Sequence, residues 1–369
     1  MIGESPELLL RRAWDAGAPR PVAAALTAAS WAYRLALVAR SSGYAVGALR
    51  TGRLPCPVVS VGNLTLGGSG KTPLAELVAL ALRRLGAMPA LVSRGYGRKS
   101  RGVRIVADGS GIQAGPLEAG DEPLLLAERL PGVPVVVGEN RLAAGRVAIE
   151  RCGATAIVLD DGYQHRTLAK DLDLLVVNGQ APWGNGRLFP RGTLREPLPA
   201  IGRASFVVVS EPPDAGALDR IVATVRRHNP AVPVAVGRIE ALAAEDKWRG
   251  ERLPPAGLAG RRLLAFAGLG RPQGFLSTLQ ALGVLVAGAV EFPDHHWFTP
   301  QDLADLVRRG RAAGAEGLVT TEKDWVRLRG FPLGGPLWVL STRLRLTTGE
   351  ETLVATLGRL VSRAPAPRA

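Results

Sequence analysis

The chain has 369 residues and is longer than a single hydrophobic core usually supports, so two domains are expected. A composition of 47% apolar and 21% charged residues excludes a disordered chain. The two cysteines, Cys56 and Cys152, form no CxxC pair, which argues against a zinc site or a disulfide framework. The formal net charge of +14 favours an anionic partner, such as a membrane surface or a phosphorylated substrate, and the 5% aromatic content argues against nucleic acid. The alternative is that an arginine- and alanine-rich composition only keeps the protein soluble.

The first predicted element is an N-terminal helix. Residues 21–38 (PVAAALTAASWAYRLALV) are apolar and helix-prone and carry one charge, at Arg34. A bilayer span takes roughly 20 apolar residues, so this interrupted run is marginal for a span. It fits an interfacial helix better, because Arg34, Arg40, Arg50 and Arg53 supply basic neighbours. An ordinary helix that packs over the domain is the alternative, and the sequence leaves the two open.

Short apolar runs typical of buried strands alternate with helical segments along the rest of the chain. Strands are predicted at residues 57–61, 90–93, 133–137, 156–159, 172–177, 206–210, 232–236, 263–267, 284–291, 317–320 and 337–340, and helices at 73–85, 122–130, 140–152 and 300–313. Such alternation is typical of a parallel sheet covered on both faces. Residues 179–203 interrupt it with five glycines and four prolines, which predicts a long functional loop or a crossing between domains.

A glycine-rich loop, TLGGSGKT, joins the first predicted strand to the helix that follows. Glycines let backbone N–H groups curl around an anion, and the helix N-terminus adds a favourable dipole there. Lys71 can then reach the β- and γ-phosphates, and the Thr72 hydroxyl can ligate magnesium. The usual pattern begins with glycine, whereas this loop begins with Thr65; a loop that merely joins strand to helix is the alternative. The predicted nucleotide-binding residues are Thr65, Leu66, Gly67, Gly68, Ser69, Gly70, Lys71 and Thr72.

Two acidic pairs accompany this loop. Asp160 and Asp161 end an apolar strand, where P-loop proteins hold magnesium, and the following GYQH brings His165 to the same edge. The segment GDEP places Asp121 and Glu122 at the start of a helix. Both are candidates for magnesium and for the carboxylate that accepts the proton of an attacking hydroxyl. Ordinary turn chemistry and a favourable helix dipole are the alternatives for the two pairs.

Histidines are scarce, with four in the chain. His228 lies in a basic helical stretch and is expected at the surface. His295 and His296 follow an apolar strand in FPDHHWF, so at least one of them is expected to point into a cleft.

These features predict an α/β fold: a P-loop NTPase-type parallel-sheet domain with a second, smaller α/β domain and an N-terminal membrane-associated helix. The predicted division is 1–50 for the N-terminal helix region, 51–203 for the P-loop domain and 204–369 for the smaller domain, whose last helix could pack back on the first domain.

Nine blocks in one order resemble a known family. They are GNLTLGGSGKTP, SRGYGRKSRG, GDEP, GENR, LDDGYQH, GNGRLFPRGTLREP, AFAGLGRP, FPDHHWF and TTEKD. Together they look like the tetraacyldisaccharide 4'-kinases of lipid A biosynthesis, over nearly the whole chain. The resemblance implies transfer of the ATP γ-phosphoryl group to the 4'-hydroxyl of a tetraacylated disaccharide 1-phosphate, giving lipid IVA. It also implies a peripheral or monotopic location at the cytoplasmic face of the bacterial inner membrane.

The resemblance also assigns residue roles. Asp121 falls on the family's base and His295 on its histidine partner, with His296 as a competing neighbour. Lys71 is the third expected catalytic residue. This chain has Tyr163 at a position where phenylalanine is frequent in the family, and we expect this change to be tolerated. Magnesium and nucleotide roles fall on Thr72, Glu122, Asp160 and Asp161. Substrate binding is expected from Arg94, Arg191, Asn185 and His165. The basic blocks 94–101 and 187–195, which contain the two arginines, suit the substrate's 1-phosphate.

The expected partners are therefore ATP with Mg²⁺, the acylated disaccharide phospholipid and an anionic membrane surface; no nucleic acid and no protein partner are predicted. The main alternative is a P-loop GTPase or metallochaperone-like protein. TTEKD only loosely resembles the guanine-selecting N-K-x-D motif, because Lys323 and Asp324 are adjacent and no asparagine precedes them. A non-catalytic membrane scaffold would leave Lys71, Asp121 and Asp160 without a role.

Overall fold

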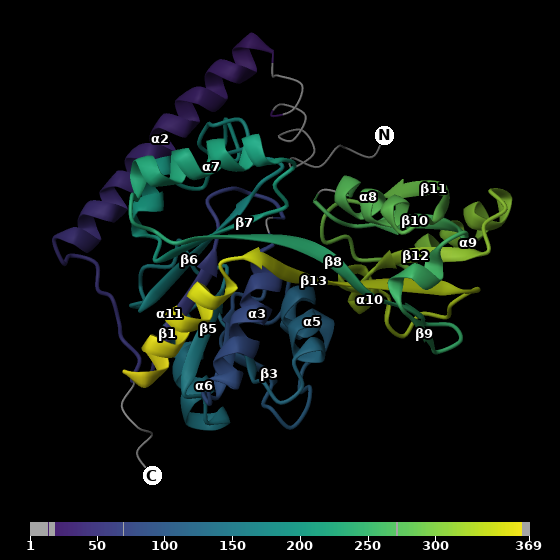
Figure 1. Ribbon diagram of the computed structural model, residues 1–369, viewed down its shortest axis with the longest axis horizontal. Coiled ribbons are helices and arrows are strands. Elements are labelled where there is room, and N and C mark those ends of the chain that lie inside the picture. Colours follow the sequence, from purple (N-terminus) through teal and green to yellow (C-terminus); the bar gives the residue numbers. More distant parts are fainter. Residues whose placement is uncertain (1–13, 15–18, 69, 271, 364–369) are drawn as a thin grey trace. The chain divides into compact units, whose positions relative to one another are not determined.

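The computed structural model describes residue 14 and residues 19–68, 70–270 and 272–363 (Figure 1). These residues gather into two compact units. Unit 1 takes its described residues from Met1–Lys71, Val158–Gly237 and Leu346–Ala369, and unit 2 takes them from Thr72–Ile157 and Arg238–Arg345. Each unit is assembled from segments that are separate in the sequence, whereas the predicted division at residues 50 and 203 cuts the chain into contiguous pieces.

Unit 1 is built on a parallel sheet whose strands are apolar along most of their length. The strands are β1 (Val58–Gly62), β5 (Ala156–Asp160), β6 (Leu172–Asn178), β7 (Phe206–Ser210) and the first residues of β8 (Val234–Asp246). They are hydrogen-bonded in the order β5-β1-β6-β7-β8, and the register pairs Val59 with Leu172 and Val207 with Val234. Every residue of β1, β5 and β7 is buried, as expected of a parallel sheet covered on both faces.

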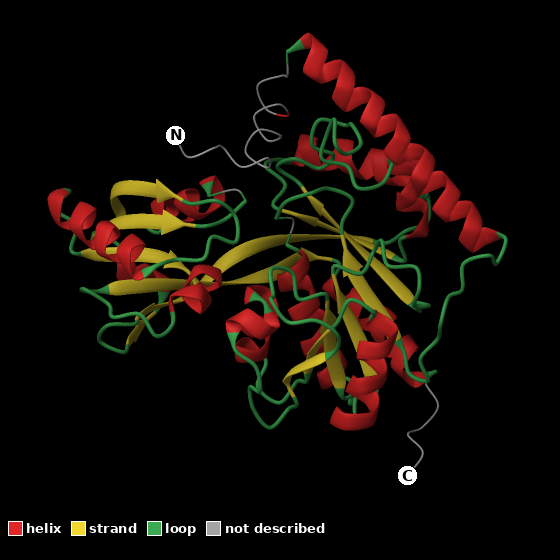
Figure 2. Ribbon diagram, turned by 180° about the vertical axis from the view of Figure 1, so that it is seen from behind, coloured by secondary structure: helices red, strands yellow, loops and turns green. Residues whose placement is uncertain are grey.

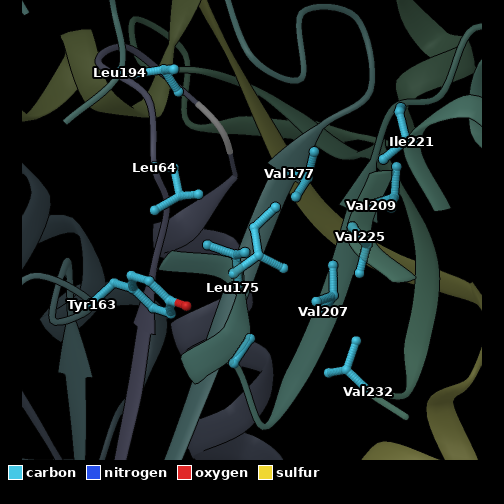
Figure 3. Packing of buried hydrophobic residues seen from close by; sticks show 12 residues of the cluster. Leu64, Tyr163, Leu175, Val177, Leu194, Val207, Val209, Ile221, Val225 and Val232 are labelled. Carbon is cyan, nitrogen blue, oxygen red and sulfur yellow. The ribbon is translucent and has the colours of Figure 1, made fainter. Parts of the chain in front are cut away.

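One face of this sheet carries the hydrophobic core shown in Figure 3. Alternate residues of β6 and β7 point into it and meet helix α7 (Ala215–His228), which contributes Ile221 and Val225. Tyr163 is fully buried in this core, and its hydroxyl donates to the backbone oxygen of Ala200 over 2.7 Å. The other helices formed by the described residues of the unit are α2 (Arg20–Ala45), the 3-10 helix η2 (Leu198–Arg203) and α11 (Glu350–Ser362).

The first segment of unit 2 carries three short strands and four helices. They are α3 (Lys71–Arg84, with Lys71 still in unit 1), β2 (Pro89–Ser93), β3 (Arg104–Ala107), α4 (Pro116–Ala119), α5 (Asp121–Arg129), β4 (Val135–Val137) and α6 (Arg141–Cys152). The strand order is β2-β4-β3, with β3 antiparallel to β4. Helix α6 begins where the side chain of Asn140 accepts from Ala143 N–H and ends at Gly153, whose φ of +69° suits a residue without a Cβ.

The second segment of unit 2 contains β8, β9 (Glu251–Leu253), the 3-10 helix η3 (Pro255–Leu258), β10 (Arg262–Ala267), α8 (Gln273–Ala281), β11 (Leu285–Glu291), α9 (Pro300–Ala312), β12 (Gly317–Thr321), α10 (Glu322–Leu328) and β13 (Leu337–Thr348). The strand order is β11-β10-β12-β13-β8, with β9 paired to β8. Alternate residues of β10 pack in different cores: Leu263 with α8, and Leu264 with α9 and α10. Since successive strand residues face opposite sides, these helices cover opposite faces of the sheet (Figure 2).

Helix α2 is longer than the sequence predicted. The prediction ended at residue 38, whereas the helix runs on to Ala45 and, with 26 residues, is long and apolar enough to cross a membrane by length and composition alone. None of its residues is buried. Trp31, Leu35 and Val38, which lie on one side of the helix at the spacing i, i+4, i+7, are all more than half exposed.

Most predicted elements are confirmed, including the α/β class and the largely parallel sheet. The predicted ranges lack the short elements β3, β9, α4, α8 and α10. They also lack the longer helices α7 and α11, for which the sequence indicated only a basic helical stretch around His228 and a last helix without bounds. The prediction also ended one strand at residue 236, whereas β8 continues to Asp246. The continuation, GRIEALAAED, carries charges and alanines, which lower the strand propensity of this part. Residues 179–203, which were predicted to be a functional loop or a domain crossing, lie wholly within unit 1.

Candidate active site

The glycine-rich loop follows β1 and ends in the first residues of α3, as predicted. Gly67 and Gly70 have φ values of +98° and +85°, the left-handed region that side-chain-bearing residues rarely adopt. The side chain of Asn178 donates to the Gly68 oxygen over 3.1 Å, and this contact holds the loop to the end of β6. Ser69, one of the predicted nucleotide-binding residues, lies outside the described residues. The remainder has the strand–loop–helix setting of a phosphate-binding loop.

Thr65 explains why this loop can begin without glycine. Thr65 is buried and pairs with Leu194 in an isolated antiparallel bridge, and the next N–H, of Leu66, donates to the Thr193 oxygen over 2.7 Å. The described non-glycine residues with positive φ are Asp161, Glu211 and His295. The loop therefore opens in strand-like pairing, and its first left-handed turn falls on Gly67.

Lys71 lies beside the acidic pair at the end of β5. Its Nζ is 3.7 Å from Oδ1 of Asp161, and the Arg195 guanidinium binds both oxygens of the same carboxylate at 2.8 Å. Asp161 has a φ of +54°, an uncommon backbone conformation for an aspartate. Asp160, the last residue of β5, is 3% exposed. All of these residues belong to unit 1, so the predicted phosphate-binding lysine and acidic pair do lie together.

A second cluster lies within unit 2, where α5 begins. Oδ2 of Asp121 is 2.8 Å from Nδ1 of His295. The carboxylate is 3% exposed, and its other oxygen accepts the N–H of Glu122 over 3.0 Å. Gly120 precedes it with a φ of +87°, and a Cβ there would lie 2.7 Å from the Tyr96 oxygen, so GDEP requires its glycine. His295 itself has a φ of +58°, which is a strained conformation for a histidine.

Electrostatics keep Asp121 ionised. Burial alone would raise the pKa of this carboxyl, but the hydrogen bond from His295 and the charges of Lys323 and Arg327 outweigh burial and lower its pKa to about 2. Arg327 Nε is 3.8 Å from Asp121 Oδ2, and its guanidinium also binds Asp324 at 2.6 Å. The buried Arg327–Asp324 pair thus supports the site from α10.

Lys323, also on α10, links three residues of the same cluster. Its Nζ lies 3.0 Å from Glu122 Oε1, 3.5 Å from Asp294 Oδ1 and 3.3 Å from His295 Nε2. Burial acts to lower the pKa of Lys323, but the three carboxylates around it prevail and raise it. Lys323 is therefore an ammonium group at neutral pH.

The structure separates the two adjacent histidines. His296 Nε2 is 3.1 Å from Asp302 Oδ2, and its ring stacks on Phe292 with centroids 4.8 Å apart. Asp302 in turn forms a capping box with Thr299 at the start of α9. His296 thus belongs to the helix cap, whereas His295 contacts the acidic residue predicted as the base.

The four residues predicted to bind substrate do not form one group within a unit. Arg94 is exposed in unit 2, while the other three belong to unit 1. Asn185 Nδ2 donates to the Arg191 oxygen over 3.2 Å, and the Arg191 N–H donates to Ser30 Oγ of α2 over 2.9 Å. His165 Nε2 lies 2.7 Å from Thr167 Oγ1. Their substrate roles stay predictions.

The magnesium ligands also stay predictions. Among the residues that the structure describes, no group of three or more His, Cys, Asp and Glu side chains is arranged to hold a metal. Mg²⁺ in kinases commonly takes only one or two carboxylates and completes its coordination with water and phosphate oxygens. Asp160 at the end of β5 fits such a sparse set, whereas Asp161 is engaged by Lys71 and Arg195 and Glu122 is engaged by Lys323.

Three residues of these clusters escaped the sequence interpretation. Arg195 was visible only as part of a basic block expected to hold the substrate phosphate. Lys323 and Arg327 lie in and just after TTEKD. The sequence interpretation compared this segment only with a guanine-selecting motif and did not relate it to GDEP. The one available signal was the position of TTEKD at the end of a predicted strand, where polar residues of α/β folds tend to gather.

Comparisons with known proteins point to one family. A sequence model of the family described as tetraacyldisaccharide-1-P 4'-kinase matches residues 22–361. A tetraacyldisaccharide 4'-kinase of Syntrophus aciditrophicus is 41% identical over 359 residues, covering 91% of this chain and 94% of the relative. Another, of Anaeromyxobacter sp. (strain K), is 44% identical over 360 residues, covering 96% of this chain and 93% of the relative.

A solved structure is similar over nearly the same length. LpxK from Aquifex aeolicus, crystallised in complex with ATP, superposes with a TM-score of 0.71 at 32% identity, covering 93% of this chain and 99% of that chain. The fold, the loop at Gly67, the cluster at Asp121 and these relatives together lead to one assignment. This chain belongs to the tetraacyldisaccharide 4'-kinase family.

Proposed function

We propose that this chain transfers the γ-phosphoryl group of ATP to the 4'-hydroxyl of a tetraacyldisaccharide 1-phosphate, with Asp121 as the acceptor of the hydroxyl proton. Family membership makes it a kinase of lipid A biosynthesis. The observation that carries the residue assignment is the 2.8 Å contact between Asp121 and His295. A buried carboxylate held by a histidine at a helix start is suited to receive a proton.

The donor phosphates are assigned to the loop from Thr65 to Thr72. Its backbone N–H groups and the N-terminus of α3 offer positive partial charge to the β- and γ-phosphates, and Lys71 adds a full charge. Phosphoryl transfer depends mainly on positioning and on neutralising charge. The contacts of Asp161 with Lys71 and Arg195 would hold the lysine in place until phosphate oxygens compete for it.

Asp121 acts as a weak base that is ionised at neutral pH. A carboxylate with a pKa of about 2 does not abstract a proton from an alcohol in the ground state. In a loose, metaphosphate-like transition state the hydroxyl becomes acidic only as it bonds to phosphorus, so a late transfer to a weak base is sufficient. Before that point Asp121 orients the hydroxyl by accepting its hydrogen bond.

Magnesium is the proposed cofactor. Thr72, Asp160 and Asp161 each offer an oxygen of the kind that Mg²⁺ takes beside phosphates. Glu122 stays a candidate, although its Oε1 is 3.0 Å from the Lys323 ammonium. When bound, Mg²⁺ would neutralise charge on the β- and γ-oxygens. The chain's own residues would place the donor and accept the proton.

Helix α2 would hold the enzyme at the membrane that carries its lipid substrate. One side of α2 contacts the rest of unit 1: Tyr33 donates to the Arg195 oxygen over 2.7 Å, and Arg40 lies 3.6 Å from Glu196. The exposed stripe of Trp31, Leu35 and Val38 is left for acyl chains and interfacial lipid. The cytoplasmic face of the inner membrane is the location that follows, with Arg94, Arg191, Asn185 and His165 as candidate contacts for the phosphorylated sugar.

The GTPase alternative is not favoured. Lys323 and Asp324, which would have to read a guanine base, are engaged with Glu122 and Arg327 inside unit 2. With these contacts, α10 would support Asp121 rather than bind a guanine base.

The proposal is tested by incubating the chain with γ-labelled ATP, Mg²⁺ and a tetraacyldisaccharide 1-phosphate in detergent micelles. Label should move to the glycolipid with the wild type and not with Asp121→Ala. Asp305→Ala, which removes a half-buried acid of α9 that pairs with Arg308, serves as the matched control and should behave as the wild type. Equal transfer by wild type and Asp121→Ala would refute the base, and no transfer by the wild type would refute the activity.

A further inference from the structure

A cavity of about 380 Å³ lies in unit 1 beside the C-terminal end of α2. Its volume is in the range of small-molecule sites, roughly 300–1,000 Å³. Three cations and one carboxylate line the cavity, namely Arg166, Lys170, Arg203 and Asp173. Hydroxyl groups of α2 and of the segment after it also line it, on Ser41, Tyr44 and Thr51. A lining with this excess of positive charge favours an anion.

Two of the three cations are already neutralised by carboxylates. Lys170 Nζ is 2.6 Å from Asp173 Oδ2, and the Arg203 guanidinium is 2.7 Å from Glu196 Oε2. Lys170 also donates to the backbone oxygen of Tyr163 over 3.0 Å. A ligand anion in the cavity would therefore depend mainly on the third cation, Arg166.

Arg166 is held in the cavity wall by neutral groups. Its guanidinium donates to Ser41 Oγ over 2.8 Å and lies 5.8 Å from the centre of the Tyr44 ring. Within the described ranges 19–68, 70–270 and 272–363, no carboxylate forms an ion pair with Arg166. A guanidinium has five N–H donors in a planar fork that matches phosphate geometry, and the Ser41 hydroxyl still has its own proton to donate. The cavity thus offers a positioned cation with donors to spare.

This cavity is separate from the nucleotide loop. Asp173 is the second residue of β6, and Asn178, which holds the loop through the Gly68 oxygen, is the last. At about 3.3 Å per strand residue, Asp173 and Asn178 lie about 16 Å apart. A ligand of the cavity would therefore occupy a different site from the phosphates of ATP.

The exposed apolar stripe of α2 leads to the mouth of the cavity. Ala45, which lines the cavity, follows Val38 of the stripe by two helical turns and so lies on the same side of α2. The rise over these two turns is about 10 Å. Val46 and Leu49, which follow the helix, are 77% and 42% exposed. A lipid whose acyl chains lie along the stripe would have its headgroup within reach of the cavity.

We propose that this cavity binds the phosphate of an anionic membrane phospholipid other than the disaccharide substrate, with Arg166 as its main contact. The proposal rests on the position of α2 at the membrane, which is part of the proposed function. The phosphate takes the donors of Arg166 that Ser41 leaves free, and the stripe receives the acyl chains. The chain then recognises one headgroup at a defined place, in addition to the general attraction between a basic protein and an anionic surface.

Flotation of the full chain with two kinds of vesicle tests the proposal. One kind is phosphatidylcholine alone, and the other is phosphatidylcholine mixed with phosphatidylglycerol. The wild type should bind the mixed vesicles more tightly. Arg166→Gln should weaken binding to the mixed vesicles at least about ten-fold, the loss expected for a hydrogen-bonded contact between charged groups. Binding to phosphatidylcholine alone should not change, because α2 is intact.

Two further variants separate a site from general charge attraction. Arg34→Gln removes the same charge from an exposed position of α2, where the guanidinium lies over the Trp31 ring. It should weaken binding to the mixed vesicles by no more than about five-fold, the share of a single cation near an anionic surface. Ala169→Leu fills the cavity without any change in charge and should reduce binding as Arg166→Gln does. Equal effects of Arg166→Gln and Arg34→Gln, or no effect of Ala169→Leu, would overturn the proposal.

Inorganic phosphate distinguishes a lipid headgroup from a soluble ligand. We expect it to bind too weakly to displace the wild type from the mixed vesicles. Binding of inorganic phosphate that requires Arg166, together with vesicle binding that does not, would show that the lipid assignment is wrong.

The kinase assay separates this proposal from the proposed function. Transfer of label in detergent micelles, which contain no phospholipid, should be the same in wild type and Arg166→Gln. Absent transfer by the wild type would refute the kinase activity and leave the vesicle results unaffected. An unchanged preference of Arg166→Gln for the mixed vesicles would refute the headgroup site and leave the activity unaffected.

Discussion

Nδ1 of His295 lies 2.8 Å from Oδ2 of Asp121, although 174 positions separate the two residues in the chain. Both are held in place by their backbones as well as by each other. His295 is in the left-handed region, and Asp121 follows a glycine in that region at the start of α5. The contact is therefore a feature of the fold and not of two free side chains.

The adjacent histidines give a matched pair of substitutions. His295→Gln should reduce kcat by about 100-fold, since it removes the imidazole that orients the base. His296→Gln should change kcat by less than about three-fold, because His296 contacts Asp302 of the α9 cap rather than Asp121. Steady-state kinetics of both variants provide the measurement. Similar losses in the two would show that the contact with Asp121 is not what matters.

The lowered pKa of Asp121 predicts how stability depends on pH. The folded pKa is about 2, below the value of about 3.9 for an aspartate in an unfolded chain. The ionised carboxylate therefore contributes stability that is fully present above about pH 4 and is lost as pH falls toward 2. Thermal unfolding of wild type and Asp121→Asn should show a gap in Tm that narrows as the pH is lowered through this window.

The same comparison with Asp305→Asn provides the control, since Asp305 pairs with Arg308 at the surface of α9. Its effect should be small at every pH. A gap for Asp121→Asn that stays constant from neutral to acid pH would contradict the linkage.

Tyr163 gives a prediction about packing. Its ring is fully buried and its hydroxyl donates to the Ala200 oxygen over 2.7 Å. Tyr163→Phe should keep the ring but lose this hydrogen bond, at a cost of about 1 kcal/mol in the free energy of unfolding. Tyr44→Phe, at a half-buried residue of α2, should cost less. Urea unfolding of both variants would measure the difference, and equal stabilities would mean that the Tyr163 hydroxyl contributes nothing.

The exposed stripe of α2 predicts membrane binding. Trp31→Ser combined with Leu35→Ser should weaken binding to anionic vesicles at least about ten-fold, because each large apolar side chain contributes roughly 1.5–3 kcal/mol when it leaves water. Leu285→Ser removes another apolar residue that is more than half exposed, on β11, and should not affect binding. Vesicle flotation is the measurement. Unweakened flotation of the double variant would exclude the stripe as the contact.

The fold was predictable where the residue pattern is local. Runs such as PVVSV and AIVLDD have the apolar continuity of buried parallel strands, and β1 and β5 lie close to where they were expected. The extension of β8 was not predictable, because it carries several alanines and charges and its burial follows no regular alternation. A strand of that kind is stabilised by its partners more than by its own residues.

The site was predictable in its parts but not in its connections. Asp121, Lys71 and the acidic pair at Asp160 could be singled out because loops and strand ends carry recognisable chemistry. The choice between His295 and His296 depends on a left-handed backbone at one of them, which neighbouring sequence does not specify. Lys323 meets Glu122 across 201 positions, a relationship that no local pattern contains.

Helix α3 and strands β5, β8 and β13 each begin in one unit and finish in the other, so the chain passes between the units after residues 71, 157, 237 and 345. The unit that carries most of the nucleotide loop also needs residues from Leu346 onward, including α11. On the ribosome, the strands around Lys71 would emerge long before these last residues. The nascent chain could not complete that unit, or gain a finished nucleotide site, until synthesis had passed residue 346. Truncations before that point should therefore expose apolar strand surface to aggregation and chaperones rather than yield a smaller working kinase.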